Sequence, residues 1–158
     1  MMNMPDIKTA FENVGIKVQE KEEKPLGGTP VPKDYVELAE KVMIKISEPA
    51  RTGDKRNFKI TTSKIRNILS LVTEIHNKER LNLSEKLSPE SQGKIQLMKV
   101  RVLYEAGRDQ TGAVKRFVVE SKMLDYIDGI GESKERFNNF VHYMESLVAY
   151  HRYLGGRD

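Results

Sequence analysis

From Asp34 onward, apolar residues recur at intervals of three and four positions, which is the spacing of one face of an α-helix. The first such segment begins at Tyr35 and continues through Val42 to Ile46. Asp34 is a suitable N-cap for it, and Pro49 would stop it because proline cannot donate the backbone hydrogen bond that a helix interior needs. The pattern therefore predicts a first helix between these two residues.

The same spacing predicts four more helices along the chain. They cover residues 62–76, 88–107, 114–129 and 133–155. Ser88 followed by Pro89 is a typical helix start, and Gly107 is a typical stop. No alternating strand of useful length is present, so we expect an all-α fold, a single-domain bundle of about five helices over residues 34–158.

Residues 1–33 lack this regularity. They contain the charge run EKEEK and four of the six prolines, a composition that breaks helices and strands alike, so we expect a flexible N-terminal arm. Four apolar residues, Ile7, Phe11, Val14 and Val18, are nevertheless spaced by 4, 3 and 4. This part of the arm is either a short helix that docks on a partner or a tail without a role.

Positive charge is concentrated in the middle of the chain. The formal net charge is +4, but residues 51–108 hold thirteen Lys or Arg side chains against six acidic ones. Clustered cations favour a polyanionic partner because binding releases condensed counterions. The segment 50–59 has no apolar period, and we interpret it as a basic loop. A solvated basic face without a ligand is the alternative.

Little in the sequence supports catalysis. There is no cysteine, the three histidines lack the HExxH spacing, and no GxSxG or P-loop motif occurs. His142 and Glu145 are too weak a pair to predict a metal site, and we expect no metal or cofactor. No secretory signal or run of about 18 apolar residues is visible, so we expect a cytoplasmic protein that does not enter a membrane.

The long cations on the predicted helices and loop are the best candidate binding groups. We select eight of them as RNA-binding: Lys55, Arg56, Lys64, Arg66, Lys94, Lys99, Arg101 and Arg108. Lys94, Arg101 and Arg108 are seven residues apart and so nearly stacked on one helix, with Tyr104 among them as a ring on which a base could stack. Without a base-reading motif, we expect contacts to RNA backbone and shape.

The last predicted helix carries more aromatic residues than one core-facing stripe can hold. Tyr143, Tyr150 and Tyr153 cannot all face the core that Phe137 and Phe140 face. Aromatic residues outside a core stripe are typical of partner surfaces. We therefore expect these three tyrosines to form an interface.

Three blocks in order carry a family resemblance: TTSKIRNIL at 61–69, KIQLMKVRVLYEAGR at 94–108 and HYMESLVAYHRYLGGRD at 142–158. Together they resemble the small subunit of type III-A CRISPR (Csm) effector complexes over roughly residues 34–158. Residue-by-residue matching places that family's basic positions on Lys64, Arg66, Lys99, Arg101 and Arg108, and adds Arg152.

This resemblance implies a non-catalytic helical subunit of a complex for antiviral defence. It would be present in several copies, stacked on one another beside the repeated backbone subunit, with a large subunit in the same complex. Its cations would contact the target RNA that is paired with guide RNA. A helical scaffold with a solubilising basic face remains the alternative, and salt-dependent RNA binding distinguishes the two.

Overall fold

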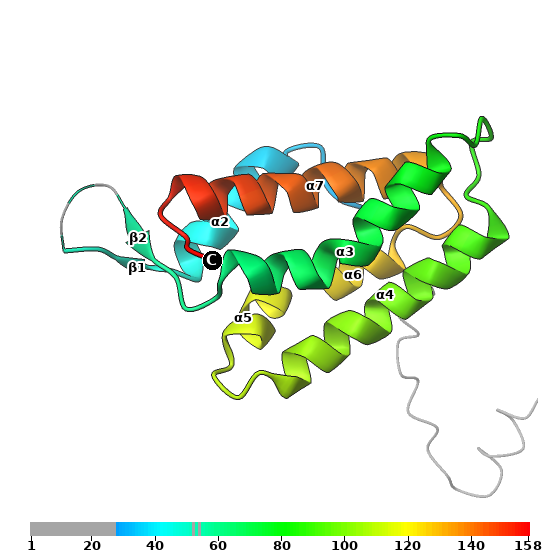
Figure 1. Ribbon diagram of the computed structural model, residues 1–158. Coiled ribbons are helices and arrows are strands. Elements are labelled where there is room, and N and C mark those ends of the chain that lie inside the picture. The colour runs from blue at the N-terminus through cyan, green and yellow to red at the C-terminus, as the bar shows by residue number, and fades with distance from the viewer. Residues whose placement is uncertain (1–27, 52, 54) are drawn as a thin grey trace, which may run out of the picture.

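The structure is a computed structural model that describes residues 28–158 except 52 and 54, and it confirms the all-α prediction (Figure 1). Six helices are present in this part of the chain instead of about five. They are α2 (Tyr35–Lys45), α3 (Thr62–Glu79), α4 (Pro89–Arg108), α5 (Ala113–Glu120), α6 (Met123–Asp128) and α7 (Lys134–Tyr153).

The C-terminal helix α7 lies at the centre of the packing, with α2 along one side and α3 along the other. Helix α3 also packs along α4, and the short helices α5 and α6 close the remaining side of α4 (Figure 1). Phe117, Phe137 and Phe140 are fully buried in the shared core. Among the described elements, α3, α5 and α6 make the main contacts with α4, and the face of α4 that carries Val100 and Tyr104 is exposed.

Side chains cap three of the helices at their N-termini. The hydroxyls of Thr61, Ser88 and Ser133 accept hydrogen bonds from the third backbone N–H beyond them, at 3.2 Å in each case. These bonds satisfy donors that a helix start leaves free. The predicted helix start at Ser88 is therefore confirmed, whereas Asp34 makes no side-chain cap bond.

The segment predicted as a basic loop, residues 50–59, contributes one strand to a small antiparallel hairpin. Strand β1 (Glu48–Pro49) pairs with β2 (Arg56–Asn57). Arg56 explains why this pairing is stable: its Nε donates to Ser47 Oγ at 2.6 Å, and its Nη2 donates to the carbonyl of Ile44 at 3.1 Å. Arg56 therefore holds the hairpin against the C-terminal end of α2.

The predicted fourth helix is interrupted. Lys122 has φ of +55°, a left-handed conformation that ends α5 and starts α6 in a new direction. Tyr143 holds this junction, because its hydroxyl donates to the carbonyl of Ser121 at 2.8 Å and its ring packs edge-on against Tyr126. The prediction that Tyr143 lies outside the core is wrong, because its side chain is fully buried and its polar end finds a partner inside.

The packed region begins earlier than Asp34. Val31 is buried, and the N–H of Thr29 donates to the carbonyl of Asp125 in α6 at 3.3 Å. The rest of the predicted arm, residues 1–27, lies outside the described residues.

Candidate nucleic-acid interface

The structure places the predicted cations on several different surfaces. Lys94, Arg101 and Arg108 do share one row, because they are seven residues apart on α4. The row lies on the side of α4 that faces α3, since Lys94 Nζ contacts the carboxylate of Glu74 in α3 at 2.8 Å. This row is the largest grouping among the selected residues.

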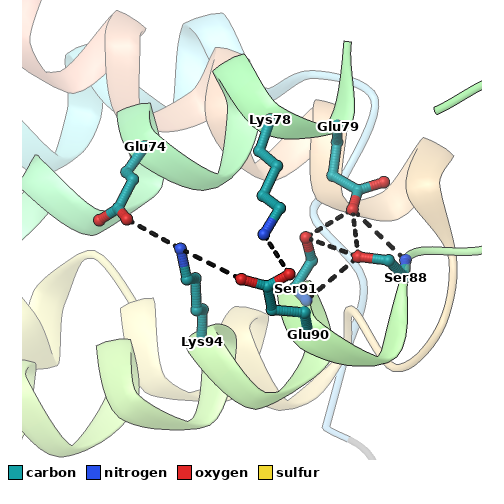
Figure 2. Close-up of polar contacts among 7 residues, drawn as sticks. All are labelled: Glu74, Lys78, Glu79, Ser88, Glu90, Ser91 and Lys94. Carbon is teal, nitrogen blue, oxygen red and sulfur yellow. Dashed lines mark hydrogen bonds and ion pairs between the residues drawn. The ribbon is translucent and has the colours of Figure 1, made fainter. Parts of the chain in front are cut away.

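Most of the cations on the α3 and α4 surface near this row are engaged in ion pairs (Figure 2). Lys94 lies between Glu74 and Glu90, and Lys78 pairs with Glu90. On α3, Lys64 Nζ lies 3.3 Å from Asp109, a carboxylate with 6% of its side chain exposed. These lysines join α3 to α4 and to the turn after it, and their positive charge is locally compensated.

Asp109 is a structural group. The backbone N–H of Val114 and the hydroxyl and N–H of Thr111 donate to it, and together with Lys64 they outweigh the effect of burial and lower the pKa of its carboxyl. The charged carboxylate thereby starts α5 and holds Lys64 at the same time. Lys64 is thus less available to a ligand than its position on an outer helix face suggests.

The positive charge of the row is not compensated by ion pairs in its C-terminal half. Arg101 and Arg108 are exposed and make no ion pair with any described residue. Tyr104 lies between them, one helical turn from each, with 62% of its surface exposed. We call Arg101, Tyr104 and Arg108 the α4 patch. The sequence already indicates Tyr104 as a ring on which a base could stack, from its place among these cations.

The other selected cations lie apart from this patch. Lys99 points to the opposite side of α4 and pairs with Asp128 of α6 at 2.7 Å. Arg56 is bonded to the end of α2, and Lys55 is exposed on the hairpin. Arg152 is exposed near the end of α7, where its Nη1 lies 3.3 Å from Asp158.

Arg66 lies on α3 at the rim of a groove between α3 and α7. The groove has a volume of about 510 Å³, and its walls are mainly apolar, with Leu69 on one side and Met144 on the other. His76 and Glu145 add polar groups to the lining. Arg66 therefore faces a different surface from the α4 patch.

The two remaining predicted interface tyrosines differ in exposure. Tyr150 is half-buried and packs against the core, whereas Tyr153 is 82% exposed at the end of α7. Only Tyr153 therefore presents most of its ring to solvent.

The first and last of the three sequence blocks, 61–69 and 142–158, meet at His151. The ring of His151 is fully buried, with Nε2 2.8 Å from the carbonyl of Ile60 and Nδ1 3.2 Å from the hydroxyl of Thr62. Burial lowers the pKa of His151, so the neutral imidazole is the form that the fold accommodates. Gly156 lies directly against the ring, where a Cβ would overlap it.

The backbone completes this contact, because the N–H of Thr62 donates to the carbonyl of Arg157 at 2.8 Å. We call His151, Thr62, Gly156 and Arg157 the C-terminal lock. The final GGRD sequence therefore has a structural use: it closes the bundle over the start of α3.

The described residues contain no group of three or more His, Cys, Asp or Glu side chains that could hold a metal ion. Within the same part of the chain, no helix is long and apolar enough to cross a membrane.

Fold and surface together define a small all-α protein that exposes two arginines and a tyrosine on one face of α4. The sequence profile of the Csm2 type III-A family matches residues 37–157. The chain is 34% identical over 125 residues to the CRISPR system Cms protein Csm2 of Mycobacterium tuberculosis, and 30% identical over 125 residues to that of Streptococcus thermophilus. Each alignment covers 79% of this chain and 94% of the relative. The chain belongs to the Csm2 type III-A family of CRISPR-associated proteins.

Proposed function

We propose that this protein is a non-catalytic RNA-binding subunit of a type III-A CRISPR ribonucleoprotein that acts in antiviral defence in the cytoplasm. Its RNA ligand is the target strand paired with guide RNA. Its protein partners are the repeated backbone subunit, the large subunit and neighbouring copies of itself. Membership of the Csm2 family supports the place in the complex.

The observation that carries the RNA-binding role is the α4 patch. Two guanidinium groups flank an exposed phenol ring on one rigid helix, so that phosphates can bind the arginines while a base or sugar packs on the ring. Such contacts read backbone and shape but not sequence. The ion-paired Lys64, Lys94 and Lys99 contribute mainly to packing between helices.

We predict that the double variant Arg101→Ala and Arg108→Ala binds single-stranded RNA more weakly and with a smaller salt dependence. Each lost phosphate contact on single strands removes about 0.7 from the slope of log K against log salt, so the slope should fall in magnitude by about 1.4. Filter binding or fluorescence anisotropy at several salt concentrations measures this. Both side chains are exposed, so the melting temperature should remain nearly unchanged.

The matched control is Lys41→Ala with Lys115→Ala. It removes the same net charge from exposed positions on α2 and α5 and should leave the slope close to that of the parent protein. Equal slopes for both double variants would show that general charge, and not the α4 patch, attracts RNA.

A scaffold role is the second candidate, and the ion pairing of the lysines favours it, because it leaves fewer free cations for RNA. Both roles require contacts between protein surfaces.

We predict that Tyr153→Ala weakens self-association of the isolated protein more than Arg108→Ala does, because Tyr153 exposes its apolar ring to solvent. Tyr143 cannot contribute in this way, since its side chain lies in the core. Sedimentation velocity at high micromolar concentration tests this, and a strict monomer would contradict it.

We also predict that the purified protein does not cleave RNA or hydrolyse nucleotides with Mg²⁺ or Mn²⁺. Such reactions need clustered carboxylates or a phosphate-binding loop. The sequence contains no P-loop motif, and the described residues contain no group of three or more His, Cys, Asp or Glu side chains that could hold a metal ion. Metal-dependent RNA cleavage that disappears when a carboxylate of this chain is changed would overturn the prediction.

A further inference from the structure

The connection between α3 and α4 presents two leucines to solvent. Leu81 and Leu83 have 89% and 99% of their surface exposed, at the opposite end of α3 from the C-terminus (Figure 1). No other large apolar side chain in the described part of the chain is as exposed. We call these two residues the leucine tip. Exposed apolar side chains that stand together usually have a partner.

The loop holds the leucine tip in one position. Asn82 lies between the two leucines and turns inward, where its Nδ2 donates to Glu79 at 2.8 Å and to the carbonyl of Lys86 at 3.1 Å. Its Oδ1 accepts a hydrogen bond from the N–H of Ser84 at 3.0 Å, and its carbonyl accepts one from Lys134 of α7. A tip fixed in this way loses little conformational freedom when it binds.

The groove between α3 and α7 offers the apolar surface that such a tip needs. Leu69, Val72, Val141 and Met144 line it, and its volume is about 510 Å³. His76 also lines it, and the buried Nδ1 of this ring makes no hydrogen bond with any described residue. Apolar walls and an unmet hydrogen bond both indicate that a partner covers the groove. The leucine tip does not fill the groove of its own chain, because both leucines are exposed.

We propose that the leucine tip of one copy docks in the α3–α7 groove of a second copy of this chain. Charge favours this occupant. The loop carries Arg80 and Glu85, the groove has Arg66 and Glu145, and none of these side chains makes an ion pair with another described residue. In the docked state Glu85 can face Arg66. Arg80 can face Glu145 in the same way.

Tip and groove are different surfaces of the chain, so the contact joins unlike faces of the two copies. This inference rests on the proposed function only in taking a neighbouring copy as the partner. Two leucines bury less area than a stable complex requires, so we expect the isolated copies to associate weakly. Covalent trapping is therefore the suitable test, and the chain has no cysteine of its own to interfere.

The experiment mixes two full-length copies that carry introduced cysteines. One copy carries Ser84→Cys beside the leucine tip, and the other, made larger by a fused tag, carries Ala149→Cys in the lining of the groove. Under mild oxidation without RNA, we expect a disulfide-linked mixed dimer on a non-reducing gel. Lys115→Cys in place of Ala149→Cys puts the thiol at an exposed site on α5 and should give only background.

Leu83→Asp in the Ser84→Cys copy should lower the yield of mixed dimer by about tenfold, because an apolar anchor of the contact is lost. Leu97→Asp is the matched control. It makes the same change at an exposed leucine of α4, away from the loop, and should leave the yield as it is.

Other results would overturn the proposal. A yield no higher than that of the Lys115→Cys pair shows that something else covers the groove. A yield that Leu83→Asp leaves unchanged, or that Leu97→Asp lowers equally, shows that the leucine tip is not the anchor. Dimers that form only after RNA is added show that RNA joins the copies. The salt dependence of RNA binding in the Arg101 and Arg108 double variant tests the proposed function separately, so either can fail alone.

Discussion

Glu79→Ala is expected to lower the free energy of unfolding by about 3 kcal/mol and the melting temperature by about 10 °C. Glu79 is 2% exposed, and it accepts hydrogen bonds from the hydroxyls of Ser91 and Ser88 at 2.5 and 2.8 Å (Figure 2). It also accepts a hydrogen bond from Asn82 Nδ2 at 2.8 Å. Removing the carboxylate leaves these donors unpaired in a buried place. Thermal and urea unfolding measure the loss.

Glu74→Ala is the matched control, since Glu74 lies on the same helix and contacts Lys94 but has 55% of its side chain exposed. An exposed ion pair contributes less than about 1 kcal/mol. If both variants lose the same stability, the buried hydrogen-bond cluster is not what makes Glu79 important.

The same cluster predicts how stability depends on pH. Burial alone would raise the pKa of Glu79, but the hydrogen bonds from Ser91, Asn82 and Ser88 outweigh it and lower the pKa from 4.5 to about 2. As the pH falls, Glu79 therefore takes up a proton in the unfolded chain before it does so in the folded protein. The contribution of this pKa difference to the free energy of unfolding, about 3 kcal/mol, is complete above pH 4.5 and is lost as the pH falls toward 2. Glu79→Gln should reduce this acid sensitivity in urea titrations at pH 6, 4.5 and 3.

Gly156→Ala is expected to destabilise the protein by about 2–4 kcal/mol, the second of the two largest effects. The new Cβ would overlap the His151 ring, which cannot move without breaking its contacts with Ile60 and Thr62. Gly107→Ala is the control, because a Cβ at Gly107 meets nothing within 4 Å and alanine favours a helix by up to about 1 kcal/mol. Denaturant unfolding compares the two.

A double-mutant cycle tests the stated cause. In a His151→Ala background the ring is gone, so Gly156→Ala should cost far less than it does in the parent. Additive costs would mean that Gly156 acts through its backbone and not through contact with His151.

The sequence predicted helix positions well because each helix carries a regular core-facing stripe. The break between α5 and α6 was missed, although Val118 and Met123 are five residues apart and therefore out of phase on one helix. The burial of Tyr143 could not be predicted, since it follows from the redirected chain at Lys122. An apolar stripe in the sequence shows which side of a helix faces the core. It does not show how much of the helix circumference the neighbouring elements bury.

The candidate site was predictable only in part. The spacing of Arg101 and Arg108 showed that they share a helix face. The difference between free and ion-paired cations was not visible, because Lys64 meets Asp109 and Lys99 meets Asp128 only after the helices pack. Local spacing does not report partners that are distant along the chain.

The C-terminal lock has a consequence for synthesis on the ribosome. It joins Thr62 to Arg157, 95 positions later, and His151 to Ile60 across 91 positions. The start of α3 therefore cannot complete its hydrogen bonds while the last helix is still inside the exit tunnel. Closure of this bundle must follow release of the tail and cannot proceed helix by helix during translation. A nascent chain stalled before Gly156 should accordingly remain open to protease.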